Sequence, residues 1–216
     1  MMKKEYQSKP KAMENIETYG FSWIDFVTAI PSPLFVVTSY KSNGQTNACL
    51  QSWATFVGED NNFYCIMASV NKNGHMYKTI KETNDLVINF PSAKYFDMCA
   101  ETIRNNSFDD DEIGKSGLTA ENSTTVNAPR IKECFLNLEC SFHWEKELYE
   151  CSSHIVMCVI IKNVCVDNCL FDEESGRYSE QGYIYNVHYP INPETGKGRY
   201  DCLATLKEID KTKSYY

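Results

Sequence analysis

Several sequence features that define common functional classes are missing from these 216 residues. No apolar run approaches the roughly 20 residues that a helix needs to cross a bilayer. Lys and Arg together number 21 against 29 Asp and Glu, and they form no basic stripe. Because phosphate groups are bound by clustered basic side chains, we expect neither a nucleic acid nor an anionic membrane surface as a partner.

The nucleotide-binding and nucleophile motifs of common enzymes are absent as well. The sequence contains no Gly-x-Gly-x-x-Gly after a strand-like run, no Walker loop and no Gly-x-Ser-x-Gly. These absences argue against a Rossmann domain for a dinucleotide and against the strained serine turn of an α/β-hydrolase.

Metal and disulfide signatures are also lacking. The ten cysteines form no Cys-x-x-Cys pair and the four histidines match no metal-ligand spacing, so we predict no metal site. The first 17 residues are charged and have no apolar core behind them, which argues against a secretory signal. We therefore expect a cytoplasmic protein with reduced thiols, in which cysteines inside apolar runs pack as small hydrophobic side chains.

The composition and pattern predict a globular fold that is mainly β. Hydrophobic residues make up 43% of the chain, and its length suits one domain with a small appendage. We expect a loose, flexible N-terminal arm over residues 1–20 and a single domain over residues 21–210. Two short helical segments, residues 75–84 and 93–106, interrupt the strand-like runs. An antiparallel barrel with helical decoration fits this pattern better than a doubly wound sheet.

Four segments carry more specific structural expectations. Residues 34–57 are typical of one hairpin around an Asn-Gly turn. Residues 136–145 alternate apolar with polar side chains and predict a strand with one wet face. Residues 154–168 are largely apolar on both faces, which predicts a strand covered by a barrel interior and by a subunit contact. The acidic run 109–112 lies in a polar segment, and we expect it to be solvated.

Two segments are candidates for a binding site. Residues 45–55 combine strand-like residues with Asn, Gln, Ser and Thr but carry no charge. These groups either satisfy the backbone of a tight turn or line a pocket for a flat polar molecule. Residues 71–79 place a glycine-containing break before a helix, where free N–H groups and nearby lysines make an anion site. A turn in which Asn71 or Asn73 merely caps the helix is the open alternative.

Taken in order, these segments resemble the flavin reductase-like family, which includes the flavoredoxins. The pattern is a Pro before a β-run ending in Thr or Ser, a Gly turn, Asn-Ala, a Ser-Trp-x-Thr-like strand, a Lys-Asn-x-His helix start and Asn-x-Pro-Ser. Later pieces are similar too, namely SGLTAENS, the strand around LEC, SHIVMCVIIKNV and YPINPETGK. The resemblance covers roughly residues 30–205. It implies an antiparallel, Greek-key-like split β-barrel that binds FMN.

The resemblance also implies which residues contact the flavin. They are Thr38 and Ser39 beside the isoalloxazine, Asn47, Ala48 and Cys49 along the chain and ring, Ser52, Trp53, Ala54 and Thr55 at the pyrimidine edge, and Asn71, Lys72, His75, Lys78 and Thr79 around the ribityl phosphate. An uncharged polar strand suits a flavin because it satisfies ring carbonyls and N–H groups without forcing one protonation state. Trp53 is equally compatible with a plain core aromatic. Relatives often carry Thr where this chain has Met76, so Thr79 or a lysine takes over that contact.

The implied activity is an oxidoreductase in which FMN takes hydride from NADH or NADPH. The electrons then pass to free flavin, a metal complex or an electron-acceptor protein, and the family usually forms homodimers with the flavin near the interface. His154 matches a histidine that faces the flavin or nicotinamide in some relatives, although a hydrogen-bonded histidine at a strand start explains it as well. Two alternatives stay open: a flavoredoxin-like electron-transfer protein without NAD(P)H activity, and a split-barrel binding protein that has lost flavin.

Overall fold

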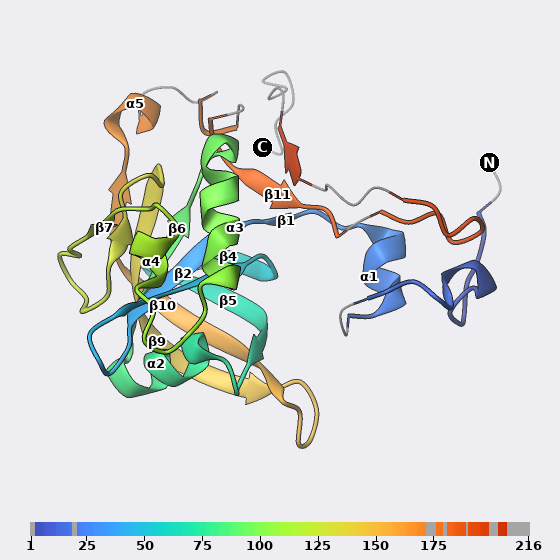
Figure 1. Cartoon of the computed structure of the whole chain (residues 1–216), viewed down its shortest axis with the longest axis horizontal. Helices are drawn as coiled ribbons and strands as arrows, with labels where there is room; N and C mark the ends of the chain where they lie inside the picture. Colours follow the sequence, from blue (N-terminus) through green and yellow to red (C-terminus); the bar gives the residue numbers. More distant parts are fainter. Residues whose placement is uncertain are drawn as a thin grey trace. The chain divides into compact units, whose positions relative to one another are not determined.

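The computed structural model describes residues 3–18, 21–171, 176–178, 181–188, 190–198 and 203–206. The chain divides into two compact units (Figure 1): Met1–Ser32 with Tyr185–Ala204, and Pro33–Ile184 with Thr205–Tyr216. Three short strands lie where the chain passes between the units: β1 (Ser32–Pro33), β11 (Ile184–Asn186) and β12 (Leu203–Thr205). The division expected from the sequence stays a prediction, and residues 1, 2, 19, 20, 172–175, 179, 180, 189, 199–202 and 207–210 of it lie outside the described residues.

The smaller unit has a buried apolar cluster of its own. Its helices are η1 (Lys11–Met13) and α1 (Trp23–Thr28). A capping box begins α1, because the side chains of Ser22 and Asp25 each accept a hydrogen bond from a backbone N–H of the first turn. Met13 packs with Phe26 and Ile191 in the cluster. Met13 is therefore a buried residue, although it lies in the arm expected from the sequence.

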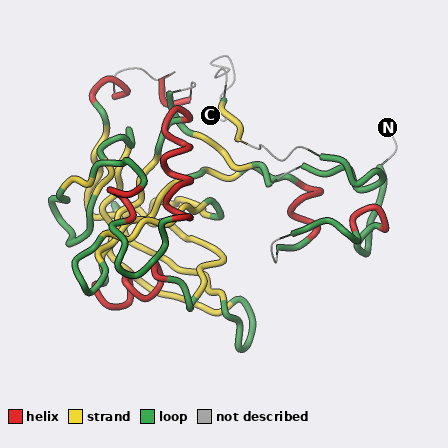
Figure 2. The backbone as a smooth tube through the Cα atoms, in the orientation of Figure 1, coloured by secondary structure: helices red, strands yellow, loops and turns green. Residues whose placement is uncertain are grey.

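The larger unit is built on a seven-stranded antiparallel sheet, drawn as yellow strands in Figure 2. Its spatial order is β3-β2-β6-β9-β10-β5-β4. The strands are β2 (Phe35–Tyr40), β3 (Thr46–Gln51), β4 (Ala54–Glu59), β5 (Asn62–Asn71), β6 (Asp85–Phe90), β9 (Leu136–Glu147) and β10 (His154–Val166). A separate pair, β7 (Ala120–Glu121) and β8 (Arg130–Ile131), forms a two-stranded sheet. The mainly β, antiparallel fold class is confirmed.

Helices pack on both faces of β2. The helices described in this unit are α2 (His75–Thr83), η2 (Ala93–Tyr95), α3 (Phe96–Arg104), α4 (Glu112–Lys115), α5 (Asn168–Phe171) and η3 (Gly176–Tyr178). Ile80 of α2 belongs to the same buried cluster as Val37, whereas Ile113 of α4 belongs to the cluster of Val36. Because successive strand residues point to opposite faces, α2 and α4 lie on opposite sides of β2. The two helical segments expected from the sequence are present.

The hairpin predicted over residues 34–57 is wrong in its second half. β3 ends at Gln51, β4 begins at Ala54, and these strands are the two edges of the sheet. Among the described strands, β4 pairs with β5 and not with β3. Three Cα–Cα steps span at most about 11 Å, so the sheet curls until its edges come that close at Ser52 and Trp53. The chain crosses there from one edge of the sheet to the other, and no Gly or Pro in the sequence marks this crossing.

The face of β9 predicted to be wet is partly buried. Asn137 and Glu139 are 4% and 0% exposed. The Asn137 amide donates to Asn89 Oδ1, and the Glu139 carboxylate accepts three hydrogen bonds from Thr124 and Thr125. The polar side chains of this half of the strand thus have buried partners. The alternation was correct, but it did not reveal that another segment covers the polar face.

All cysteines in the described part of the chain are free thiols. Burial raises the pKa of Cys134 and Cys140 well above the ordinary thiol value and that of Cys99 to about 12. Because the thiolate is the reactive form, we expect iodoacetamide at pH 8 to label exposed Cys151 and Cys169 long before Cys134 or Cys140. A time course of peptide mapping by mass spectrometry checks this, and equal labelling rates would contradict it.

Candidate functional site

Helix α2 is the element around which the predicted phosphate-binding residues gather. It begins at His75, and its N-cap residue is Gly74, which provides no side-chain cap. Asn71 Oδ1 accepts a hydrogen bond from the N–H of Asn73 (2.9 Å) in the turn that precedes the helix. The alternative in which Asn71 or Asn73 caps the helix is therefore wrong. The first N–H groups of α2 are left to partners other than a capping side chain.

A pocket of about 260 Å³ lies along one side of α2. It is lined by Lys41, His75, Lys78, Thr79, Glu82 and Phe108. Four of these residues follow one another at helical spacing, so they share one face of α2. Three of the predicted phosphate ligands, His75, Lys78 and Thr79, are thus brought together.

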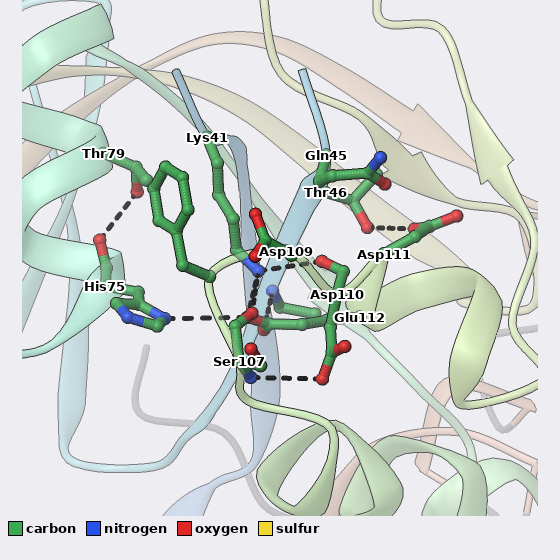
Figure 3. A network of polar contacts seen from close by, with 12 residues as sticks. Lys41, Gln45, Thr46, His75, Thr79, Ser107, Asp109, Asp110, Asp111 and Glu112 are labelled. Carbon is green, nitrogen blue, oxygen red and sulfur yellow. Dashed lines mark hydrogen bonds and ion pairs between the residues drawn. The ribbon is translucent and has the colours of Figure 1, made fainter. Parts of the chain in front are cut away.

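Lys41, which lines this pocket, forms a buried ion pair with Glu112 (Figure 3). Lys41 Nζ lies 2.7 Å from Glu112 Oε1, and the two side chains are 0% and 1% exposed. Lys41 Nζ also donates hydrogen bonds to the carbonyl oxygens of Ser107 (2.8 Å) and Asp110 (2.9 Å). Glu112 Oε2 accepts a hydrogen bond from the N–H of Ala48 on β3 (2.7 Å). The pair fastens the loop before α4 to β2 and β3.

The acidic run 109–112, expected to be solvated, is largely used inside the structure. Glu112 is buried in the ion pair. The carboxylate of Asp111 accepts hydrogen bonds from the Thr46 hydroxyl (2.5 Å) and from the N–H of Gly114 (3.2 Å), which caps α4. The expectation is wrong for Asp111 and Glu112 because they bind Thr46, Ala48 and Lys41, which lie more than 60 positions earlier in the chain.

His75 lies between the pocket and Glu112 (Figure 3). Its Nδ1 is 3.9 Å from Glu112 Oε1 and forms no hydrogen bond with any described residue. The ring meets Phe108 edge-on, with centroids 6.3 Å apart and an interplanar angle of 79°. His75 therefore has hydrogen-bonding capacity that the described part of the chain does not use.

The predicted residues on the α2 side of the sheet are Ser39, Asn47 and Cys49. Ser39 is the cross-strand partner of Asn47, and its hydroxyl lies 2.6 Å from the Thr79 hydroxyl on α2. Cys49 follows on the same face of β3, where its Sγ accepts a hydrogen bond from Gln51 Nε2 (3.3 Å). Burial, above all, raises the pKa of the Cys49 thiol, so this group is neutral at physiological pH.

Asn47 carries a buried donor that has no partner among the described residues. The residue is 1% exposed, and its Nδ2 forms no hydrogen bond with any described residue. An unpaired buried donor costs about 1–3 kcal/mol. It therefore marks a place where a bound acceptor would be favourable.

Thr38 and Ala48 point to the opposite face of the sheet. The Thr38 hydroxyl donates to the carbonyl oxygen of Pro129 (2.5 Å) and accepts from Asn89 Nδ2 (3.0 Å). Ala48 is buried in the cluster that contains Ile113. Their side chains are engaged away from α2, and a role for their backbone atoms in binding flavin stays a prediction.

The residues predicted at the pyrimidine edge lie at the crossing between the sheet edges. Ser52 is buried and Trp53 is half-buried. The carbonyl oxygen of Trp53 accepts a hydrogen bond from the N–H of Ala68 (2.7 Å). Ala54 packs against the larger buried cluster, whereas Thr55 is exposed on the other face of β4. Only one of these two neighbours can therefore point its side chain inward.

Lys72, Asn71 and His154 form a second group beside the start of α2. Lys72 Nζ pairs with Glu147 Oε1 (2.6 Å) in an exposed ion pair. His154 on β10 is the cross-strand partner of Asn71, and its Nδ1 lies 3.1 Å from the Ser153 hydroxyl. The structure brings these distant positions together, but none of the three lines the pocket.

Sequence reasoning missed Lys41, Glu82 and Phe108. Lys41 follows a strand and precedes a turn, a place where lysine is usually exposed. Phe108 adjoins the acidic run, in a segment that was expected to be polar and solvated. Glu82 had a signal, because it lies seven residues after His75 and four after Lys78, on the same face of a helix.

The described residues lack two further features. No helix there is both long and apolar enough to span a membrane. No group of three or more His, Cys, Asp or Glu side chains in the same residues is arranged to hold a metal ion.

Comparisons with known proteins agree with this architecture. A putative flavin reductase with a split barrel domain from Shewanella frigidimarina has a TM-score of 0.73 and 16% identity, covering 94% of this chain and 96% of that chain. Nitrilotriacetate monooxygenase component B from Bacillus cereus has a TM-score of 0.70 and 19% identity, covering 91% and 97%. The flavoredoxin of Desulfovibrio vulgaris has a TM-score of 0.58 and 21% identity, covering 91% and 99%. At these identities the likeness shows the split-barrel fold.

The sequence itself matches a family model. The model is described as the flavin reductase like domain, and the match covers residues 27–186, most of the chain. The chain therefore belongs to the flavin reductase-like domain family and is a flavin-related oxidoreductase.

Proposed function

We propose that this chain is an FMN-binding, NAD(P)H-dependent flavin reductase, which passes electrons from a nicotinamide to flavin or a downstream acceptor. The observation that carries the proposal is the unpartnered, buried Nδ2 of Asn47 on the face of β3 that adjoins α2. This donor lies on the strand that the resemblance assigns to the flavin. Its neighbours on the same face, Ser39 and Cys49, are uncharged, which suits a flat redox cofactor with carbonyls along one edge.

The residues at α2 fit a phosphate at one end of such a cofactor. The helix starts without a side-chain cap, and N–H groups at a helix start bind anions. Lys41 is paired with Glu112 and donates to two carbonyl oxygens, and Lys72 is paired with Glu147. Lys78 is thus the cation at this site whose ammonium has no ion-pair partner among the described residues, and we propose it as the main phosphate ligand.

When bound, the flavin would supply the hydride and electron chemistry. The chain would contribute orientation through Asn47 and Ser39, and a fixed wall through the Lys41–Glu112 pair. This division of labour needs no nucleophile and no acid–base pair. We propose His154 as a residue on the nicotinamide side, because it lies beside Asn71 near the start of α2.

We also propose a homodimer. The outward face of the β4, β5 and β10 strands carries Val57, Tyr64, Ile66 and Ile160, and Val57 is 46% exposed. An apolar face of this kind is typical of an interface. The free thiols suit the reducing cytoplasm that we propose as its location.

A visible spectrum tests the proposed function. The purified protein is soaked with FMN, desalted and then titrated anaerobically with NADH or NADPH. A retained flavin spectrum that bleaches supports the reductase. A retained spectrum that bleaches only with a low-potential electron donor points to a flavoredoxin-like carrier, and a colourless protein that does not oxidise NADH with added flavin points to a barrel that has lost flavin.

Replacing Asn47 with Leu is expected to weaken FMN binding by about tenfold or more, because a hydrogen bond of about 1.5 kcal/mol is lost. The free energy of unfolding should not fall, since the substitution removes an unpaired buried donor. Fluorescence titration with FMN and urea unfolding measure the two effects. Asn62→Leu, at the exposed first residue of β5, is the matched control. Unchanged FMN affinity in Asn47→Leu would remove Asn47 from the site.

A further inference from the structure

We propose that Glu145 of β9 is a positioning residue for the flavin phosphate, because its carboxylate holds α2 in the orientation in which the helix start and Lys78 receive that phosphate. The inference rests on the proposed function, whose phosphate site it uses. It adds a residue that does not line the pocket. Glu145 acts through α2 and does not touch the flavin.

Glu145 lies on the side of the sheet that α2 covers. Its cross-strand partner on β10 is Met157, which is buried in the same apolar cluster as Ile80 of α2. Because directly opposite residues of two antiparallel strands share one face, the Glu145 side chain also points to the α2 side. This side chain is 27% exposed, so its carboxylate stands at the boundary between the cluster and solvent.

Two side chains of α2, one helical turn apart, contact the two oxygens of this carboxylate. The Tyr77 hydroxyl donates a hydrogen bond to Glu145 Oε1 (3.0 Å), and Lys81 Nζ lies 3.3 Å from Oε2. The same ammonium lies 4.2 Å from the centroid of the Phe142 ring on β9. Burial, above all, raises the pKa of the Tyr77 hydroxyl, which therefore stays a donor at physiological pH. Glu145 thus joins two positions of one helix to β9.

Directional contacts on two flanks of α2 fix its rotation about its own axis. Ile80 turns toward the buried cluster, but apolar packing is non-directional. With 3.6 residues per turn, Tyr77 and Thr79 lie about 60° and about 100° to either side of Ile80. On the Thr79 flank the hydroxyl meets that of Ser39 (2.6 Å), and on the Tyr77 flank the hydroxyl meets Glu145. Without Glu145, the helix is held by directional side-chain contacts on the Thr79 flank alone.

This role predicts an effect of opposite sign to that of the charge. Lys78 follows Tyr77 directly, so a rotation of α2 moves the Lys78 ammonium and re-aims the first N–H groups of the helix. Loss of Glu145 should therefore weaken phosphate binding. By charge alone, removing an anion from beside an anion site would strengthen it. The direction of the change separates the two roles.

Fluorescence titrations with FMN and with riboflavin test the inference, because riboflavin lacks the phosphate. We expect Glu145→Ala to weaken FMN binding about fivefold and riboflavin binding less than about twofold. Tyr77→Phe, which keeps the ring but loses the hydroxyl, should change both affinities in the same directions. Glu145→Gln should restore most of the FMN affinity, since its amide oxygen still accepts from Tyr77. Glu150→Ala, at an exposed position of the same hairpin, should leave both affinities unchanged.

Hydrogen exchange of the α2 backbone amides in the flavin-free chain adds a readout that needs no flavin. We expect faster exchange in Glu145→Ala than in the wild type, because α2 opens more readily. Unchanged or tighter FMN binding in Glu145→Ala, or equal losses for FMN and riboflavin, would refute this inference and leave the proposed function standing. A wild type that binds neither flavin would refute the proposed function, and the inference with it.

Discussion

Replacing Lys41 with Met is expected to lower the free energy of unfolding by about 3–5 kcal/mol, because it leaves the carboxylate of Glu112 buried without its cation. Glu112 is 1% exposed, so water cannot take over the role of the ammonium. The carbonyl oxygens of Ser107 and Asp110 lose their donor in the same substitution. Urea unfolding followed by circular dichroism and tryptophan fluorescence measures the loss.

A second substitution separates ion pairing from simple packing. Glu112→Gln keeps an acceptor for the N–H of Ala48 but removes the charge, so the double variant Lys41→Met/Glu112→Gln should be more stable than Lys41→Met. Arg104→Met breaks an exposed pair with Glu101 and should change stability by less than about 1 kcal/mol. If the changes in the free energy of unfolding caused by Lys41→Met and Glu112→Gln simply add in the double variant, the buried pair is not what holds this loop.

Replacing Glu139 with Gln is expected to cost about 2 kcal/mol at pH 7 and much less near pH 3. Burial acts to raise the pKa of this carboxyl, but hydrogen bonds from Thr125 and Thr124 outweigh it and hold the pKa below the ordinary value of 4.5. A lowered pKa in the folded state means that the stabilisation is present above about pH 4.5 and disappears as the pH falls through the folded pKa.

The pH dependence distinguishes this effect from a packing defect. Urea midpoints of the wild type and Glu139→Gln, measured at pH 7, 5 and 3, should converge as the pH falls. Glu59→Gln, at an exposed position, should follow the wild type at every pH. A difference between wild type and Glu139→Gln that stays constant from pH 7 to pH 3 would show that the carboxylate charge contributes nothing.

Glu139 and Glu112 are charged residues that are buried at positions where the sequence pattern predicted exposure to solvent. Glu139 stands at a polar position of an alternating strand, and Glu112 ends a run of aspartates. Periodicity identifies which side of a strand a residue occupies, but it does not tell what covers that side. The donors that satisfy these carboxylates come from segments elsewhere in the chain: Thr124 and Thr125 for Glu139, and Lys41 for Glu112.

The candidate site shows the same limit. The sequence placed His75, Lys78 and Thr79 on one helix, and the structure does bring them to one pocket. The sequence could not show that the side chains of Thr38 and Ala48 point to the opposite face of the sheet from those of Ser39 and Asn47. That outcome follows from the two-residue period once the register of β2 and β3 is known.

The sequence by itself determined the mainly β fold class, the two helical segments and the family, because these follow from local periodicity and from an ordered set of short motifs. Only the tertiary structure decided that β3 and β4 form opposite edges of one curled sheet, that Lys41 and Glu112 form a buried pair, and that Phe108 faces α2. Each of these depends on contacts between residues far apart in the chain. Such contacts are selected by the free energy of packing the whole unit, which cannot be inferred from any short stretch of sequence.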